Sequence, residues 1–393
     1  MQHRVVILGA GVAGLEAALA LNHLARDEVT VELVSPDTDF VYRPLAVAEP
    51  FRLGEARRFP LSNLVADTGA SLTRASATAV DTDRKVVETS SGELPYYQLL
   101  LALGAKPLVA VPGAVTFRGP QDEGAFGAVL SAAREGRARR LVFTMPAGIS
   151  WPLPLYELAL LTAVHLADSG VGGVTIELVT PEPHPLQLFG TAASEAIVEL
   201  FQLHGIGLVT GVPLRVEPDA LELVGGERIE ADRVVALPRL EGPGLSGVPH
   251  DGSGFVTVDE HQRVRGHDAV FAAGDVADFP VKQGGLAAQQ ADAAAEAIAA
   301  AAGVDVDPRP FTPVLRGLLL TGLTPRFLRS ELGKHQTEID TEALWWPPAK
   351  IVGRYLAPFL AAQMHVSTSP PRTEGVEIDV ELDRGPAGAW QRI

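Results

Sequence analysis

The fold of this chain is decided by its opening stretch, Val5-Val6-Ile7-Leu8-Gly9-Ala10-Gly11-Val12-Ala13-Gly14. A short apolar run leads into the pattern G-x-G-x-x-G, and an Ala- and Leu-rich segment, Leu15–Ala25, follows it. This order predicts a strand, a tight loop and a helix, which is the context that the glycine pattern requires. A second strand is expected at Val29–Val34. The chain therefore opens on a β–loop–α–β unit of the Rossmann type.

The glycines of this loop have distinct physical roles. Gly9 permits the tight turn, Gly11 lets the backbone approach a pyrophosphate, and Gly14 lets the helix pack closely on the strand. The start of the helix, with Val12 and Ala13 in its first turn, offers free N–H groups and the positive end of the helix dipole. We therefore expect a dinucleotide diphosphate to bind at residues 9–14.

The end of the second strand departs from the usual pattern. An acidic residue normally stands there and binds a ribose hydroxyl. In this chain the position holds Ser35, followed by Pro36, and Asp37 lies two residues further on. Either Ser35 or Asp37 could bind the ribose, and the sequence leaves both open. Ser35 and Pro36 are counted among the expected cofactor contacts.

A second unit of the same kind is expected later in the chain. Leu141–Thr144 reads as a strand, Leu155–Asp168 as a helix and Val174–Val179 as a strand. The stretch Val29–Asp37 matches Val174–Glu182 almost position for position. Such self-similarity indicates an internal repeat, so the chain is expected to contain two Rossmann-like units.

The predicted fold class is α/β, with two three-layer Rossmann-like domains and a C-terminal hairpin and helical segment. The Gly- and Pro-rich segment Arg239–Gly254 reads as a linker, and Val314–Thr321 with Arg326–Glu331 reads as a hairpin. The tail from Ser367 is polar and expected to be mobile. The expected domains are residues 1–110 with 250–312 (FAD-binding), 111–249 (NAD(P)-binding-like) and 313–393 (a C-terminal interface segment with its tail).

Composition excludes several functional classes. The chain has 393 residues, of which 47% are hydrophobic, so two or three domains with a large core are feasible. A net charge of −16 argues against a nucleic-acid partner. The absence of cysteine excludes disulfides, thiolate nucleophiles and iron–sulfur ligation, and no metal-ligand cluster stands out. Without a signal peptide or a long apolar run, the protein is expected to be cytoplasmic, or peripheral to a membrane.

Two further segments carry a family resemblance. With the opening glycine loop, Leu100-Leu101-Ala102-Leu103-Gly104-Ala105-Lys106-Pro107 and Ala272-Ala273-Gly274-Asp275-Val276-Ala277 resemble the FAD-site motifs of the pyridine nucleotide–disulfide oxidoreductase superfamily. The resemblance covers residues 1 to about 330, with Leu103 in place of the usual Thr. It implies that FAD is the cofactor. It also implies contacts from Gly104 and Gly274, and from Asp275 to the ribityl chain or the adjacent phosphate region.

The local sequence is most similar to the quinone-reducing branch, which contains sulfide:quinone reductases and type II NADH dehydrogenases. Both Phe40-Val41-Tyr42-Arg43-Pro44 and Lys282-Gln283-Gly284-Gly285-Leu286-Ala287 resemble segments of those enzymes, although the lack of cysteine argues against sulfide oxidation. Glu157, in the helix expected at Leu155–Asp168, resembles a Glu that lies near the flavin in this family and could relay a proton there. The resemblance implies cofactor contacts from Arg43, Gly284, Gly285 and Leu286, and catalytic roles for Glu157, Tyr42 and Lys282.

The second glycine loop is degenerate. It reads Met145-Pro146-Ala147-Gly148-Ile149-Ser150-Trp151-Pro152-Leu153-Pro154, in which only Gly148 remains of the expected glycines. Pro146 and Pro152 remove N–H donors, and Trp151 is bulky where a pyrophosphate would lie. Glu182 could still bind a ribose. The sequence therefore leaves NAD(P)H binding open. The alternatives are that the second unit is a retained scaffold, or that it shapes a pocket for an apolar or aromatic substrate.

These observations predict an FAD-dependent oxidoreductase that passes two electrons from a small-molecule reductant to a quinone-like or other small acceptor. The alternatives are an NAD(P)H dehydrogenase with an atypical nicotinamide site and a non-catalytic flavoprotein-derived binding protein. The aromatic and basic segment 344–360 has the residue types of a peripheral membrane contact. Because the chain is acidic overall and the segment has few cations, core packing or a homodimer interface is the favoured interpretation.

Overall fold

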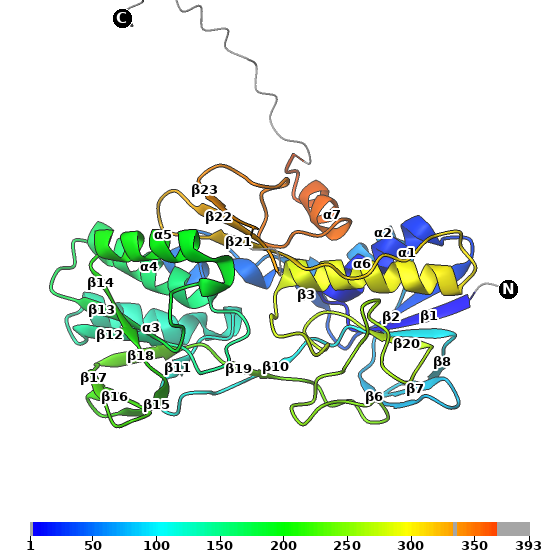
Figure 1. The fold of residues 1–393 in the computed structure, drawn as a ribbon, viewed down its shortest axis with the longest axis horizontal. Helices are drawn as coiled ribbons and strands as arrows, with labels where there is room; N and C mark the ends of the chain where they lie inside the picture. Colours follow the sequence, from blue (N-terminus) through cyan, green and yellow to red (C-terminus); the bar gives the residue numbers. More distant parts are fainter. Residues whose placement is uncertain (1–2, 333–335, 368–393) are drawn as a thin grey trace, which may run out of the picture.

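A computed structural model describes residues 3–332 and 336–367 of the chain. Two Rossmann-like units lie side by side along the long axis of the molecule (Figure 1). The C-terminal strands and the last helix lie across one side of both units and bridge the junction between them. The two parallel sheets, each covered by helices, confirm the predicted α/β class. The tail expected to be mobile begins at Ser367, and all of it after Ser367 lies outside the described residues.

The first unit is built on a five-stranded parallel sheet in the order β20-β9-β1-β2-β5. Successive side chains of the central strand β1 point to opposite faces of this sheet. Val5 and Ile7 pack against the helices, and Val6 and Leu8 pack against an antiparallel sheet on the other face. The three layers are thus helices, parallel sheet and antiparallel sheet. The elements are β1 (His3–Leu8), β2 (Val29–Val34), β5 (Ser71–Thr73), β9 (Gln98–Leu101) and β20 (Val270–Ala272), the helices α1 (Val12–Leu24), α2 (Leu61–Thr68) and α6 (Gly284–Ala301), the hairpin strands β3 (Asp39–Val41) and β4 (Arg58–Pro60), and the covering strands β6 (Ala77–Asp81), β7 (Val86–Thr89) and β8 (Gly92–Pro95).

The second unit repeats this plan with a parallel sheet in the order β11-β18-β12-β13-β14. Leu141 and Phe143 face the helices, and Val142 faces a second small antiparallel sheet. The elements are β11 (Val115–Thr116), β12 (Arg140–Thr144), β13 (Thr175–Thr180), β14 (Ile206–Thr210) and β18 (Arg233–Ala236), the helices α3 (Glu123–Arg134), α4 (Leu153–Asp168) and α5 (Thr191–Leu203), and the covering strands β15 (Pro213–Glu217), β16 (Ala220–Leu223) and β17 (Arg228–Glu230).

The two predicted repeats also share an equivalent hydrogen bond, in the turn after the second strand of each unit. After β2, the backbone N–H of Asp37 donates to Ser35 Oγ at 3.2 Å. After β13, the backbone N–H of Glu182 donates to Thr180 Oγ1 at 3.1 Å. Both sequences place a hydroxyl residue two positions before an acid, and the hydroxyl closes the same turn. The two units therefore share local geometry as well as sequence.

The segment that the sequence suggests as a linker is partly a strand. Residues Arg239–Glu241 form β19, which pairs antiparallel with β10 (Lys106–Leu108). The two connections between the units thus form a two-stranded ribbon (Figure 1). The Gly and Pro content had indicated a loop, but Pro107 and its neighbours on β10 supply a hydrogen-bonded partner that composition alone does not reveal.

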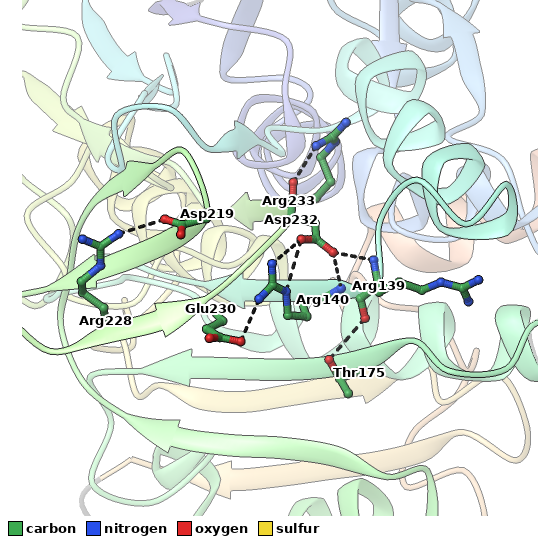
Figure 2. Close-up of polar contacts among 8 residues, drawn as sticks. All are labelled: Arg139, Arg140, Thr175, Asp219, Arg228, Glu230, Asp232 and Arg233. Atoms are coloured by element: carbon green, nitrogen blue, oxygen red, sulfur yellow. Dashed lines mark hydrogen bonds and ion pairs between the residues drawn. The ribbon is translucent and has the colours of Figure 1, made fainter.

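The amino-terminal edge of the second sheet is held by Asp232, the residue before β18 (Figure 2). Its carboxylate accepts hydrogen bonds from the backbone N–H groups of Arg139 and Arg140, at 2.6 and 2.9 Å, and from the Arg140 guanidinium. These bonds to the ionised form lower the pKa of Asp232 to about 2, with the Arg140 side chain the largest cause. Asp232 therefore joins β12 to β18 at the edge away from the candidate site.

The C-terminal segment forms a three-stranded antiparallel sheet and a short helix. The predicted hairpin is confirmed as β21 (Val314–Leu319) and β22 (Arg326–Glu331), and a third strand, β23 (Gln336–Asp340), follows. The helix α7 (Leu356–Gln363) packs Leu356 and Leu360 into the core formed with α1 and α6. Within segment 344–360, the core-packing interpretation thus holds for these buried side chains.

Candidate active site

The expected cofactor motifs meet at the carboxyl edge of the first sheet. The N–H of Ala102 donates to Leu8 O at 2.8 Å, and the N–H of Ala273 donates to Leu101 O at 2.9 Å. The loops after β1, β9 and β20 are therefore adjacent in space, although they lie far apart in the sequence. Ligands of open parallel sheets bind at this edge, beyond the carboxyl ends of the strands.

The opening glycine loop has the geometry that its motif requires. Gly9 has φ +106°, and a Cβ there would lie 2.3 Å from the carbonyl oxygen of Ala102. A Cβ at Gly14 would lie 1.9 Å from the carbonyl oxygen of Gly9, so the helix packs directly on the turn. At Gly11 nothing of the protein lies within 4 Å of that position. Of the three glycines in this loop, Gly11 alone faces open space, as a glycine in contact with a ligand would.

The start of α1 is open to an anion. Gly11 is its N-cap and supplies no side-chain bond, and no acidic residue stands in the first turn. The first N–H groups of a helix, here those of Val12 and Ala13, have no partner within it. The turn at Gly274 lies beside them, because a Cβ on Gly274 would be 3.1 Å from Ala13 Cβ and 3.4 Å from Ala287 Cβ. Two helix N-termini therefore converge on the Gly274–Asp275 turn.

A cavity of about 290 Å³ lies beside this turn, between the two units and under the C-terminal sheet. Its walls come from both Rossmann-like units and from β21. Much of the predicted site is brought together here, namely Arg43, Glu157, Asp275, Lys282 and Gly284.

The other predicted residues lie elsewhere. Tyr42 is buried, and its hydroxyl accepts the N–H of Ile351 at 3.1 Å, so it anchors the C-terminal segment and does not line the cavity. Ser35 and Pro36 follow β2, away from the cavity. Leu286 is buried, and its N–H donates to the N-cap side chain of Gln283 at 2.9 Å. Gly285 lies in the same turn, and Gly104, with φ +70°, has open space at its Cβ position.

Lys282 and Asp275 both line the cavity, and the charge of each acts on the pKa of the other. Lys282 is buried, donates to the carbonyl of Ala277 and lies 4.0 Å above the Phe255 ring. Burial lowers the pKa of Lys282 to about 8, opposed by the negative charge of Asp275. Burial raises the pKa of Asp275, opposed by the charges of Lys282 and Arg43. The protonation states of Lys282 and Asp275 therefore depend on each other.

Glu157 lines the cavity from α4 of the second unit and has a partner that the sequence did not indicate. Its Oε1 accepts the ammonium of Lys350 at 2.5 Å and the N–H of Leu320 at 2.8 Å. Both charged side chains are buried. Burial raises the pKa of Glu157 and lowers that of Lys350, and in each case the partner's charge opposes the shift. A lysine within an apolar, aromatic segment is the signal that could have identified Lys350.

Comparisons with known proteins identify the family of the chain. The sequence model of the pyridine nucleotide-disulphide oxidoreductase family matches residues 3–140 and 158–301. The chain belongs to this family. It is accordingly an oxidoreductase, and residues 141–157, which contain the degenerate second loop, lie outside the matched ranges.

Individual relatives point to the same branch. An NADH dehydrogenase-like protein of Mycobacterium tuberculosis is 30% identical over 300 residues, which is 70% of this chain and 72% of the relative. The type II NADH:quinone oxidoreductase NdhA of the same species is 27% identical over 323 residues, 71% of this chain and 67% of the relative. The sulfide:quinone oxidoreductase of Aquifex aeolicus has a similar fold, with a TM-score of 0.78 and 21% identity over 86% of each chain.

Among the residues that the structure describes, no helix combines the length and apolarity needed to cross a bilayer. The suggested peripheral contact of segment 344–360 and the homodimer both stay predictions.

Proposed function

We propose that the protein is an FAD-dependent oxidoreductase that passes two electrons from a small-molecule reductant to a quinone-like acceptor. The observation that carries this proposal is the meeting of the three motifs at one sheet edge, beside a cavity that spans both units. The residues present fit the cofactor. Gly11 is open where a diphosphate would approach, and the start of α1 lacks any protein cap.

When bound, FAD would supply the two-electron chemistry, and the chain would position and polarise it. The first-turn N–H groups of α1 would hold the diphosphate. Asp275 would accept hydrogen bonds from ribityl hydroxyls, and the positive charge of Lys282 would stabilise negative charge at its end of the cavity.

Glu157 is the residue best placed to hold a proton in the cavity. Its raised pKa favours the protonated form, and Lys350 offers a second site for that proton 2.5 Å away. Because both side chains line the cavity, the pair could take up or release a proton at the reacting ligand.

The test is the visible spectrum of the freshly purified protein, followed by titration with reductants under anaerobic conditions. A flavin spectrum that bleaches with a donor and returns with a quinone supports the proposal. Colourless protein that does not bind added FAD at micromolar concentration would contradict it.

An NADH dehydrogenase is the second candidate, favoured by the names of the Mycobacterium tuberculosis relatives. It requires a nicotinamide site in the second unit. Rapid bleaching of the flavin by NADH or NADPH would select it, and a flavin that neither compound reduces would reject it.

A further inference from the structure

The second unit contributes one wall of the cavity, and that wall is mainly apolar. Its two charged residues, Arg118 and Glu157, are already paired with Asp122 and Lys350. The wall lies where the second β–loop–α junction would receive a dinucleotide. Its apolar side chains are Phe117, Ile149, Trp151, Leu153 and Leu237, and Leu240 on the connecting strand β19 lines the same cavity.

The helix behind this wall cannot bind a diphosphate as α1 can. Its N-cap is Pro152, and Pro154 stands in its first turn, so neither offers an N–H. The N–H of Leu155 already donates to the carbonyl of Pro152 at 3.0 Å. In its first three positions, only Leu153 keeps a donor for a ligand. The cluster of free N–H groups that makes a helix start an anion site is therefore missing from α4.

The acid that would bind a ribose is also unavailable. Glu182 is 8% exposed, and its Oε2 accepts the hydroxyls of Tyr156, at 2.6 Å, and of Thr180, at 3.3 Å. Tyr156 is fully buried on α4, so the bond ties Glu182 to the core. Its counterpart after the first sheet, Asp37, is exposed. The second unit thus retains an acidic residue at this position, but Glu182 bonds to the protein core and is not free for a ligand.

The indole of Trp151 is held in place by packing. It meets the Phe189 ring edge-on, with centroids 5.9 Å apart at 64°. Phe189 in turn lies directly on Gly317, because a Cβ there would be 2.7 Å from the Phe189 ring. A fixed aromatic side chain on an apolar wall presents a surface for another ring at little cost in side-chain entropy.

We propose that this wall binds a flat, apolar ring compound without phosphate groups, of the naphthoquinone kind, in place of a nicotinamide dinucleotide. The inference rests on the proposed function, since it names the substrate class of that cavity. Trp151 would pack against the ring, and Leu237 and Leu240 would exclude water from it.

The test is calorimetric titration of the FAD-containing, oxidised protein with 2-methyl-1,4-naphthoquinone and, separately, with NADH. We expect saturable quinone binding in the micromolar range and no saturable NADH binding up to about 1 mM. Because the flavin spectrum is recorded first, failure of the proposed function appears as missing FAD. Failure of this inference appears in protein that retains FAD.

Variants locate the bound ring. Trp151→Ala should weaken quinone binding about tenfold, and Trp151→Phe, which keeps a ring against Phe189, by less than about threefold. Trp346→Ala is the control, because Trp346 does not line the cavity. If Trp151→Ala loses its FAD, Leu240→Gln on the facing strand β19 provides the same test. Saturable NADH binding, no quinone binding, or quinone binding that both wall variants leave unchanged would each overturn the inference.

Discussion

Lys350 donates to Glu157 across 193 residues of sequence, and this buried pair joins the C-terminal segment to the helix α4 of the second unit. Both partners line the cavity. The C-terminal segment therefore completes the candidate site as well as covering it. Substitutions of either residue should therefore change both the turnover and the stability of the protein.

The first prediction concerns turnover. Glu157→Gln removes the proton-holding group but keeps an acceptor for the N–H of Leu320. Turnover per bound FAD should fall about 10²-fold, the lower range for loss of a general acid–base group. The measurement is steady-state quinone reduction, normalised to flavin absorbance. Glu195→Gln, on the outer surface of α5, is the control and should match the wild type. Unchanged turnover in Glu157→Gln would remove its proton-transfer role.

The second prediction concerns stability. Lys350→Met leaves the Glu157 carboxyl buried without its cation, which typically costs about 3 kcal/mol when one partner of a buried pair is removed. The double variant Glu157→Leu with Lys350→Met replaces both charges by apolar groups and should recover most of that loss. Urea unfolding of the wild type, both single variants and the double variant gives the coupling. Additive losses would mean that the two charges do not interact.

The parts of the fold predicted from sequence are those set by local pattern. The run Val5–Gly14 specifies strand, turn and helix through residues that contact one another, and the second unit repeats the order of strand, loop and helix without the glycine pattern. The Lys350–Glu157 pair could not be predicted, because its geometry depends on how segment 344–360 packs over the cavity. Tyr42 illustrates the same limit, since no local pattern reveals that its hydroxyl accepts the N–H of Ile351, 309 residues away in the sequence.

The third prediction separates folding from cofactor binding within the glycine loop. Gly11→Ala adds a methyl group into open space, so the unfolding midpoint should stay close to that of the wild type while FAD affinity falls at least tenfold. Gly14→Ala places its methyl 1.9 Å from Gly9 O and should destabilise the fold itself. Thermal unfolding and FAD titration of both variants provide the measurement. Equal FAD affinity in Gly11→Ala and the wild type would contradict the assigned diphosphate site.

The last prediction concerns pH. Asp292 on α6 lies beside Glu16 on α1, whose carboxylate accepts the N–H groups of Tyr355 and Leu356 at the start of α7. Burial, with the negative charge of Glu16 as the next cause, raises the pKa of Asp292 to about 8 from an ordinary value of 3.8. The nearby charge of Arg354 opposes the shift. Near pH 6 the folded protein therefore keeps a proton on Asp292 that the unfolded chain has released.

This difference in bound protons sets the direction in which stability changes with pH. The folded state binds more protons than the unfolded state between about pH 4 and pH 8, so the contribution of Asp292 to stability falls as the pH rises through that window. Asp292→Asn mimics the protonated form and should lose less stability than the wild type between pH 5.5 and 8.5. Urea midpoints at both pH values measure this, with the exposed Asp305→Asn as the control that should follow the wild type. If wild type and Asp292→Asn lose stability in parallel, the carboxyl is already ionised at pH 5.5, and α1, α6 and α7 meet without a shared proton.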